Sequence, residues 1–178
     1  MLDANMPQTP IAPRFRGIST LLLASALALV APVYAAEEEE VVESEDRPVA
    51  IVVHPDTEID NLTIGELRAI FLAEQQYWPD KSRIVLLVRA PDAYERTFVL
   101  DRIYQMSETE FRRYWIAKMF RAEISSGPRV VFSTNMALGL VTAIPGSITF
   151  IQASDVGPDV KVVRIDGKLP SEEDYPLD

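Results

Sequence analysis

The stretch from Leu62 to Leu72 constrains the fold more than any other, because both a helix start and a buried face can be read from it. Thr63 and Glu66 have the spacing of a capping box, in which each side chain accepts a hydrogen bond from the other residue's backbone N–H. Apolar residues then recur every three or four positions, at Ile64, Leu67, Ile70 and Phe71. The pattern predicts a helix of about three turns with one buried face.

Strand-length apolar runs alternate with further helical patterns. The runs are Val49–Val53, Arg83–Arg89, Arg129–Phe132, Ser147–Ile151 and Val160–Ile165. Asp92 is expected to cap a helix from Ala93 to Tyr104. Ser107 and Glu110 repeat the capping-box spacing and predict a helix with Phe111, Tyr114, Trp115 and Met119 on one side. This order predicts an α/β fold: one three-layer lobe with a mixed, mostly parallel sheet and helices on both faces.

Two ordered motifs resemble segments of a known family. They are Asn61–Phe71 followed by Tyr77–Arg89, and the later segment Pro145–Phe150. These motifs are similar to the second lobe of periplasmic phosphate-binding-like proteins, the type 2 solute-binding family. There a helix is followed by a tryptophan, an acidic turn and a strand that ends in arginine. The resemblance implies a type 2 periplasmic-binding-protein-like fold and a role related to the substrate-binding proteins of phosphate ABC transporters.

The N-terminal region has the features of an export signal. Arg14 and Arg16 precede an apolar run from Ile18 to Val33, and the small residues around Tyr34 predict cleavage after Ala35. The run is shorter than the roughly 20 residues of a membrane span, and a retained membrane anchor is the alternative. We therefore predict a signal peptide at 1–35, an acidic disordered linker at 36–47, a domain at 48–166 and an irregular acidic tail at 167–178. The predicted location is the periplasm.

Composition narrows the classes of function. The net charge is −10, and an acidic chain is poorly suited to nucleic acid, which is bound through Lys and Arg. The chain has no Cys and a single His, so disulfides, thiolate zinc sites and multi-histidine metal sites are not expected. The sequence has no nucleophile, metalloprotease or phosphate-loop motif of the common kinds. We expect neither an enzyme nor a cofactor.

The candidate ligand-binding residues are Arg89, Ser133, Thr134 and Asn135. Arg89 ends a predicted strand, and the other three precede a predicted helix from Met136 to Ala143. In an α/β sheet, ligands bind beyond the carboxyl ends of strands, where helix N-termini offer free N–H groups. A guanidinium at such a place is suited to a small oxyanion such as phosphate.

Two departures from the family keep a second hypothesis open. Where phosphate-binding relatives have Ser-Gly-Thr after the arginine, this chain has Ala93-Tyr94-Glu95, which removes hydroxyl donors and adds a carboxylate. Only about a dozen residues lie between the predicted cleavage site and the first strand, so the relatives' first lobe is not expected here. The alternative is a periplasmic adaptor or interaction domain that has lost high-affinity phosphate binding. Its candidate partners are a membrane permease, a sensor or a second copy of the chain.

Overall fold

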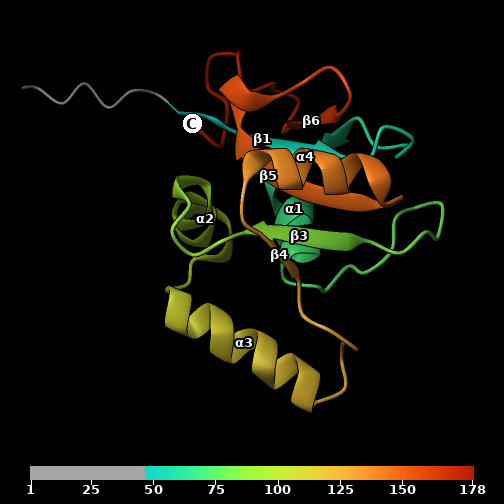
Figure 1. Cartoon of the computed structure of the whole chain (residues 1–178), viewed down its shortest axis with the longest axis vertical. Coiled ribbons are helices and arrows are strands. Elements are labelled where there is room, and N and C mark those ends of the chain that lie inside the picture. The colour runs from blue at the N-terminus through green and yellow to red at the C-terminus, as the bar shows by residue number, and fades with distance from the viewer. Residues whose placement is uncertain (1–46) are drawn as a thin grey trace, which may run out of the picture. The chain divides into compact units, whose positions relative to one another are not determined.

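The computed structural model describes residues 47–178 as a six-stranded sheet with helices on both faces (Figure 1). The predicted signal peptide and the predicted linker up to residue 46 lie outside the described residues. The strands are β1 (Val49–Val53), β2 (Asn61–Leu62), β3 (Val85–Arg89), β4 (Arg129–Val131), β5 (Ser147–Gln152) and β6 (Lys161–Ile165). The helices are α1 (Ile64–Phe71), α2 (Tyr94–Val99), α3 (Glu108–Phe120) and α4 (Thr134–Ala143), with a π-helical turn η1 (Leu100–Tyr104) and a 3₁₀ turn η2 (Ala153–Asp155).

The strand order is β2-β6-β1-β5-β3-β4. β3 pairs in parallel with β4 and β5, and β2 pairs in parallel with β6, whereas β1 runs antiparallel to β5 and β6. The predicted α/β class with a mixed, mostly parallel sheet is therefore confirmed. No helix among residues 47–178 is both long enough and apolar enough to cross a membrane.

β1 shows why the sheet needs helices on both faces. All five of its residues are fully buried, as its apolar sequence predicts. Successive side chains of a strand point to opposite faces, so Val49, Ile51 and Val53 join one core while Ala50 and Val52 join the other. Residues of α1 and α3 pack into the first core, and residues of α4 pack into the second. Figure 1 shows α4 and α1 on opposite sides of the sheet.

α1 begins as its sequence predicts. Thr63 Oγ1 accepts a hydrogen bond from the Glu66 N–H, and Glu66 Oε2 accepts one from the Thr63 N–H. Leu67, Ile70 and Phe71 are buried. Ile64 is 37% exposed, so its placement on the buried face was wrong. A helix start packs on one side only, and the three residues one turn further in fill the available core.

The region after β3 differs from the prediction in two ways. α2 begins at Tyr94 behind Ala93, which makes no side-chain cap, so Asp92 is not the helix cap. The expected single helix from Ala93 to Tyr104 is also interrupted, because its second half is the π-helical turn η1. Gln105 then takes a left-handed conformation that ends the segment.

The capping box that opens α3, formed by Ser107 and Glu110, is confirmed. Phe111 and Trp115 are buried and Tyr114 is half-buried. Met119 is 42% exposed, so its assignment to the packed side was wrong. Figure 1 shows the far end of α3, where Met119 belongs by sequence, extending beyond the sheet.

Residues 167–178 have no helix or strand, but their end belongs to the core. Tyr175 and Leu177 are buried. The Tyr175 hydroxyl donates to the Val49 carbonyl oxygen over 2.9 Å, and the Val49 N–H donates to the Leu177 carbonyl oxygen over 2.9 Å. The acidic end of the chain is therefore held at β1 by the burial of Tyr175 and Leu177 and by these two hydrogen bonds.

Candidate functional site

The parallel pairing of β3 and β4 brings the sequence-predicted site residues to one edge of the sheet. Arg89, the last residue of β3, stands opposite Val131, the last residue of β4. α4 begins three residues after Val131, at Thr134. Parallel neighbouring strands end at the same edge, so the Arg89 side chain and the N-terminus of α4 meet there.

Arg89 is the central group of this site. The residue is 7% exposed, and its Nη2 donates to Thr134 Oγ1 over 3.4 Å. Its Nε and Nη1 atoms are buried and have no hydrogen-bond partner among the described residues. Glu95 Oε2, itself buried, lies 3.8 Å from Nε, within ion-pair range but too far for a hydrogen bond. The site therefore holds a buried cation with two donor atoms that make no hydrogen bond within residues 47–178.

The three predicted residues at the start of α4 have different roles. Ser133 Oγ accepts the Met136 N–H over 3.1 Å, so this hydroxyl serves as the helix cap. Thr134 Oγ1 contacts Arg89 and also donates to Asp155 Oδ2 over 3.4 Å. Asn135 is exposed and makes no hydrogen bond to the Arg89 guanidinium. The structure thus joins Arg89 and Thr134 by a hydrogen bond, while Ser133 caps the N-terminus of α4.

Two carboxylates complete the site. Glu95 comes from the first turn of α2, and Asp155 comes from the 3₁₀ turn after β5. Sequence reasoning identified Glu95 as an unusual carboxylate near the arginine, but Asp155 was missed. No local pattern could have found Asp155, because it lies 21 residues after Thr134 and reaches it only through the return of β5.

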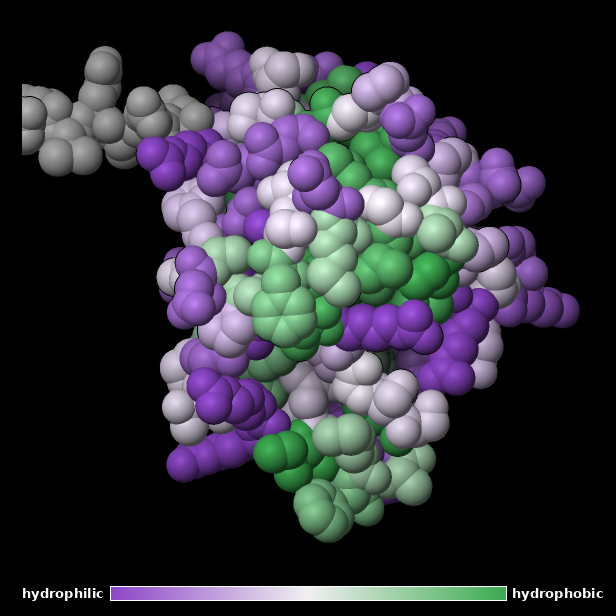
Figure 2. Space-filling view, viewed as in Figure 1, coloured by the Kyte–Doolittle hydropathy of each residue, from purple (hydrophilic) through white to green (hydrophobic). Residues whose placement is uncertain are grey.

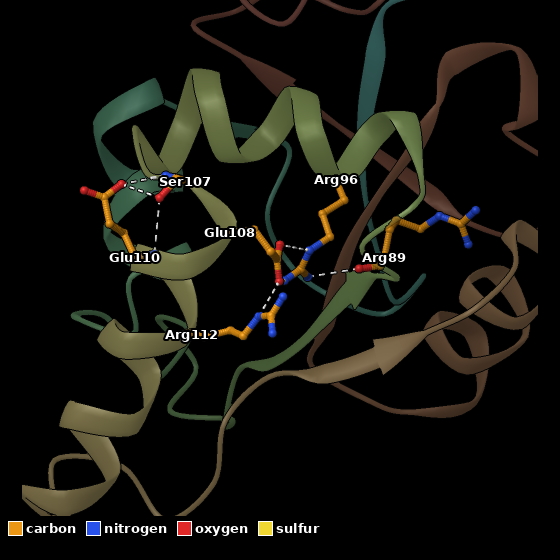
Figure 3. Close-up of polar contacts among 6 residues, drawn as sticks. All are labelled: Arg89, Arg96, Ser107, Glu108, Glu110 and Arg112. Atoms are coloured by element: carbon orange, nitrogen blue, oxygen red, sulfur yellow. Dashed lines mark hydrogen bonds and ion pairs between the residues drawn. The ribbon is translucent and has the colours of Figure 1, made fainter.

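A second arginine fixes the backbone beneath the site (Figure 3). Arg96 is 4% exposed, and its Nη1 donates to the Arg89 carbonyl oxygen over 3.0 Å. Its Nε and Nη2 donate to the two carboxylate oxygens of Glu108, over 2.9 and 3.0 Å. Figure 3 shows the Arg89 side chain extending away from this cluster. Arg96 therefore ties α2 to β3 and α3 while the Arg89 guanidinium faces α4.

We expect acid to weaken the fold in part through Glu108. The hydrogen bonds from Arg96 are the main cause that holds the pKa of the Glu108 carboxyl below its ordinary value of 4.5. Since the folded pKa is the lower one, the stabilisation is present above the unfolded pKa and is lost as the pH falls through the folded pKa. In Glu108→Gln, the free energy of unfolding should be lower at neutral pH and should fall less steeply between about pH 5 and about pH 3. Chemical denaturation at several pH values measures both the free energy of unfolding and its dependence on pH.

The control for this prediction is Glu58→Gln, which removes an exposed carboxylate far along the chain from Arg96. Its acid dependence should follow the wild type. An equally steep loss of stability in Glu108→Gln and in the wild type would contradict the role given to Glu108.

No protein-family model and no curated protein matches this chain. Solved structures do match its fold. An ABC-type phosphate transport receptor from Vibrio cholerae superposes with a TM-score of 0.59 at 19% identity, over 74% of this chain and 53% of that one. PstS from Borrelia burgdorferi gives a TM-score of 0.59 at 15% identity, over 74% and 54% of the two chains. A phosphate-binding protein from Stenotrophomonas maltophilia gives a TM-score of 0.52 at 12% identity, over 70% of this chain and 40% of that one.

The chain thus spans about half the length of the solved structures it matches. At these identities the similarity is one of fold. The resemblance read from the two sequence motifs is confirmed at that level: residues 47–178 have the α/β fold of one part of phosphate-binding transport receptors.

Proposed function

We propose that this chain is an exported solute-binding-like domain that binds a small oxyanion between Arg89, Thr134 and the N-terminus of α4. The observation that carries the proposal is that two buried guanidinium atoms of Arg89, Nε and Nη1, make no hydrogen bond within residues 47–178. Export to the periplasm through residues 1–35 and the domain limits at 48 and 166 are part of the same proposal. The similarity in fold to phosphate transport receptors supports it.

The donors at the site suit an oxyanion. A guanidinium has five N–H donors, and burying them without acceptors costs free energy, so an oxygen ligand would be stabilising. α4 is ten residues long, and its first turn has no acidic residue that would repel an anion. The first N–H groups of a helix have no partner within the helix and carry the positive end of its dipole. An oxyanion at this place would accept hydrogen bonds from both sources.

The carboxylates at the site limit which oxyanion fits. Glu95 already offsets the charge of Arg89, and Asp155 adds a negative charge beside Thr134. A fully ionised anion such as sulfate would be repelled by both carboxylates. A phosphate that keeps a proton can instead donate a hydrogen bond to a carboxylate oxygen. We therefore expect phosphate to bind and sulfate to bind weakly.

The test is a thermal-unfolding titration of the protein with phosphate and with sulfate at constant ionic strength. Phosphate at about a hundred times its dissociation constant should stabilise the fold by about 2.7 kcal/mol. Thr134→Val and Arg89→Lys should each weaken phosphate binding by roughly tenfold, because the first removes the hydroxyl that contacts the Arg89 guanidinium and the second replaces the planar guanidinium by a single ammonium. Arg113→Lys is the matched control, since Arg113 is exposed on α3, and its binding should equal that of the wild type.

Glu95→Gln tests the part played by charge. This change keeps the shape of the side chain and removes the carboxylate that opposes an anion. We expect sulfate to bind about ten times more tightly to this variant than to the wild type. Phosphate binding that is unaffected by Arg89→Lys and by Thr134→Val would refute the assignment of the site.

No stabilisation by any oxyanion would favour the second candidate function, an interaction domain that pairs with a second copy of itself. Phe120 is 87% exposed and Phe132 is 74% exposed. β4 is an edge strand of the sheet, so its outer side is open to another strand, as edge strands are in sheets that pair between chains. Figure 2 shows hydrophobic surface at the far end of α3. Sedimentation of the same samples distinguishes monomer from dimer.

A further inference from the structure

A cavity of about 240 Å³ opens at the other end of β3 from Arg89. Its walls come from the residues just before and within β3, the end of α1, α3 and the loop between α3 and β4. Arg83 and Arg129 mark its position, because Arg83 precedes β3 and Arg129 begins β4. The candidate oxyanion site lies at the carboxyl ends of the same two strands. The two places are therefore separate.

Trp115 is the first sign that this cavity takes a ligand. The residue lines the cavity and is 6% exposed. Its Nε1 atom is buried and has no hydrogen-bond partner within residues 47–178. An indole N–H can only donate, so a ligand oxygen is the kind of atom that would satisfy it. Trp78 differs in this respect, since its Nε1 donates to the Gly146 carbonyl oxygen over 2.9 Å.

The charges at the cavity are the second sign. Neither Arg83 nor Arg129 forms an ion pair with a carboxylate of residues 47–178. Arg83 donates one hydrogen bond, from Nη2 to Ser125 Oγ over 3.1 Å. Glu123, which lies in the loop between α3 and β4, is instead paired with Lys118 and Arg121. In a chain of net charge −10, two guanidinium groups without a carboxylate partner make this cavity locally positive.

The remaining walls define the rest of the ligand. Ile70, Ile84 and Ile124 line the cavity together with the Trp115 ring. Its volume is slightly below the range of roughly 300–1,000 Å³ that is usual for ligand pockets, so the ligand must be small. A guanidinium binds a carboxylate through two parallel hydrogen bonds, and the isoleucine side chains suit an apolar body.

We infer that this cavity binds a small monocarboxylate with an apolar body. The carboxylate lies against Arg83 and Arg129, one of its oxygens accepts the Trp115 N–H, and the apolar body packs on the isoleucine side chains. Benzoate is a suitable probe of this class. Benzyl alcohol has a similar body without the charge and serves as the matched control ligand.

The experiment follows the indole N–H resonances of the ¹⁵N-labelled protein during a benzoate titration. The chain has two tryptophans, and a Trp78→Phe variant assigns their signals. Benzoate should shift the Trp115 signal in a saturable way and leave the Trp78 signal unchanged. Benzyl alcohol should bind at least tenfold more weakly. Arg83→Gln and Arg129→Gln should each weaken benzoate binding at least fivefold, whereas Arg113→Gln, which removes an exposed arginine of α3, should leave it unchanged.

Three results would overturn the inference. They are the absence of a saturable Trp115 shift with benzoate, equal binding of benzoate and benzyl alcohol, and unchanged benzoate affinity in both arginine variants. Arg83 and Arg129 are exposed, so their replacement should leave the unfolding midpoint close to that of the wild type. Phosphate should not shift the Trp115 signal. A lack of benzoate binding at this cavity can therefore be distinguished from a lack of phosphate binding at Arg89.

Discussion

Gly146→Ala is expected to destabilise the fold by about 3 kcal/mol or more and to lower the midpoint of thermal unfolding by about 10 °C. Gly146 has a φ of +74°, a conformation that costs an L-residue roughly 1–2 kcal/mol. A Cβ atom added here would lie 2.5 Å from the carbonyl oxygen of Arg83. That neighbour is backbone, so the clash can be relieved only by moving the chain before β3.

The position matters because the Gly146 carbonyl oxygen accepts two hydrogen bonds. One comes from Trp78 Nε1 over 2.9 Å and the other from the Val85 N–H over 3.1 Å. Shifting this turn would therefore disturb the buried tryptophan, the start of β3 and the start of β5 together.

Gly139→Ala is the matched control for this substitution. Gly139 lies within α4, and an added Cβ would meet no atom within 4 Å. Alanine favours helix over glycine by roughly 1 kcal/mol, so this variant should be slightly more stable than the wild type. Chemical denaturation gives the free energy of unfolding of both variants. A loss below about 1 kcal/mol for Gly146→Ala would contradict the close approach of the two backbones.

Arg96→Met is expected to lower the free energy of unfolding by about 3 kcal/mol, because it removes the group that joins three elements. Arg96 donates to the Arg89 carbonyl oxygen and to both oxygens of Glu108, which begins α3. Its guanidinium also lies 4.5 Å from the centre of the Phe111 ring, a favourable cation–π contact. Methionine fills much of the volume but makes none of these polar contacts.

Arg112→Met provides a control on the same carboxylate. Arg112 also contacts Glu108, over 3.3 Å, but its side chain is 68% exposed. Exposed ion pairs of this kind contribute about 0.5 kcal/mol or less. The two variants should therefore differ by roughly 2 kcal/mol or more in urea unfolding. Similar losses of stability in the two variants would show that the contribution of Arg96 to stability does not depend on its burial.

The local parts of this fold could be predicted from short sequence patterns. The capping boxes at Thr63 and Ser107 were predicted correctly, because both partners lie within three residues of each other. The apolar run of β1 predicted a strand buried on both faces for a similar reason. Asp92 has a capping side chain too, but the chain turns there and the helix begins two residues later. A suitable residue type does not by itself fix where a helix begins.

Burial was predicted less well than helix position. Ile64 and Met119 follow the apolar spacing of their helices, and both are more than one-third exposed. The helical repeat tells which residues share a side of a helix. How much of that side is covered depends on the neighbouring elements, and α3 extends beyond them.

The sequence by itself determined the helix starts at Thr63 and Ser107, five of the six strands and the positions of Arg89 and Thr134 at the ends of a strand and a loop. The tertiary structure alone decided which distant groups meet. It placed Asp155 beside Thr134, and it brought Arg83, Arg129 and Trp115 around one cavity. The physical reason is the range of the interactions. Caps and periodicity act within a few residues, whereas these contacts depend on how the strands pair across the sheet.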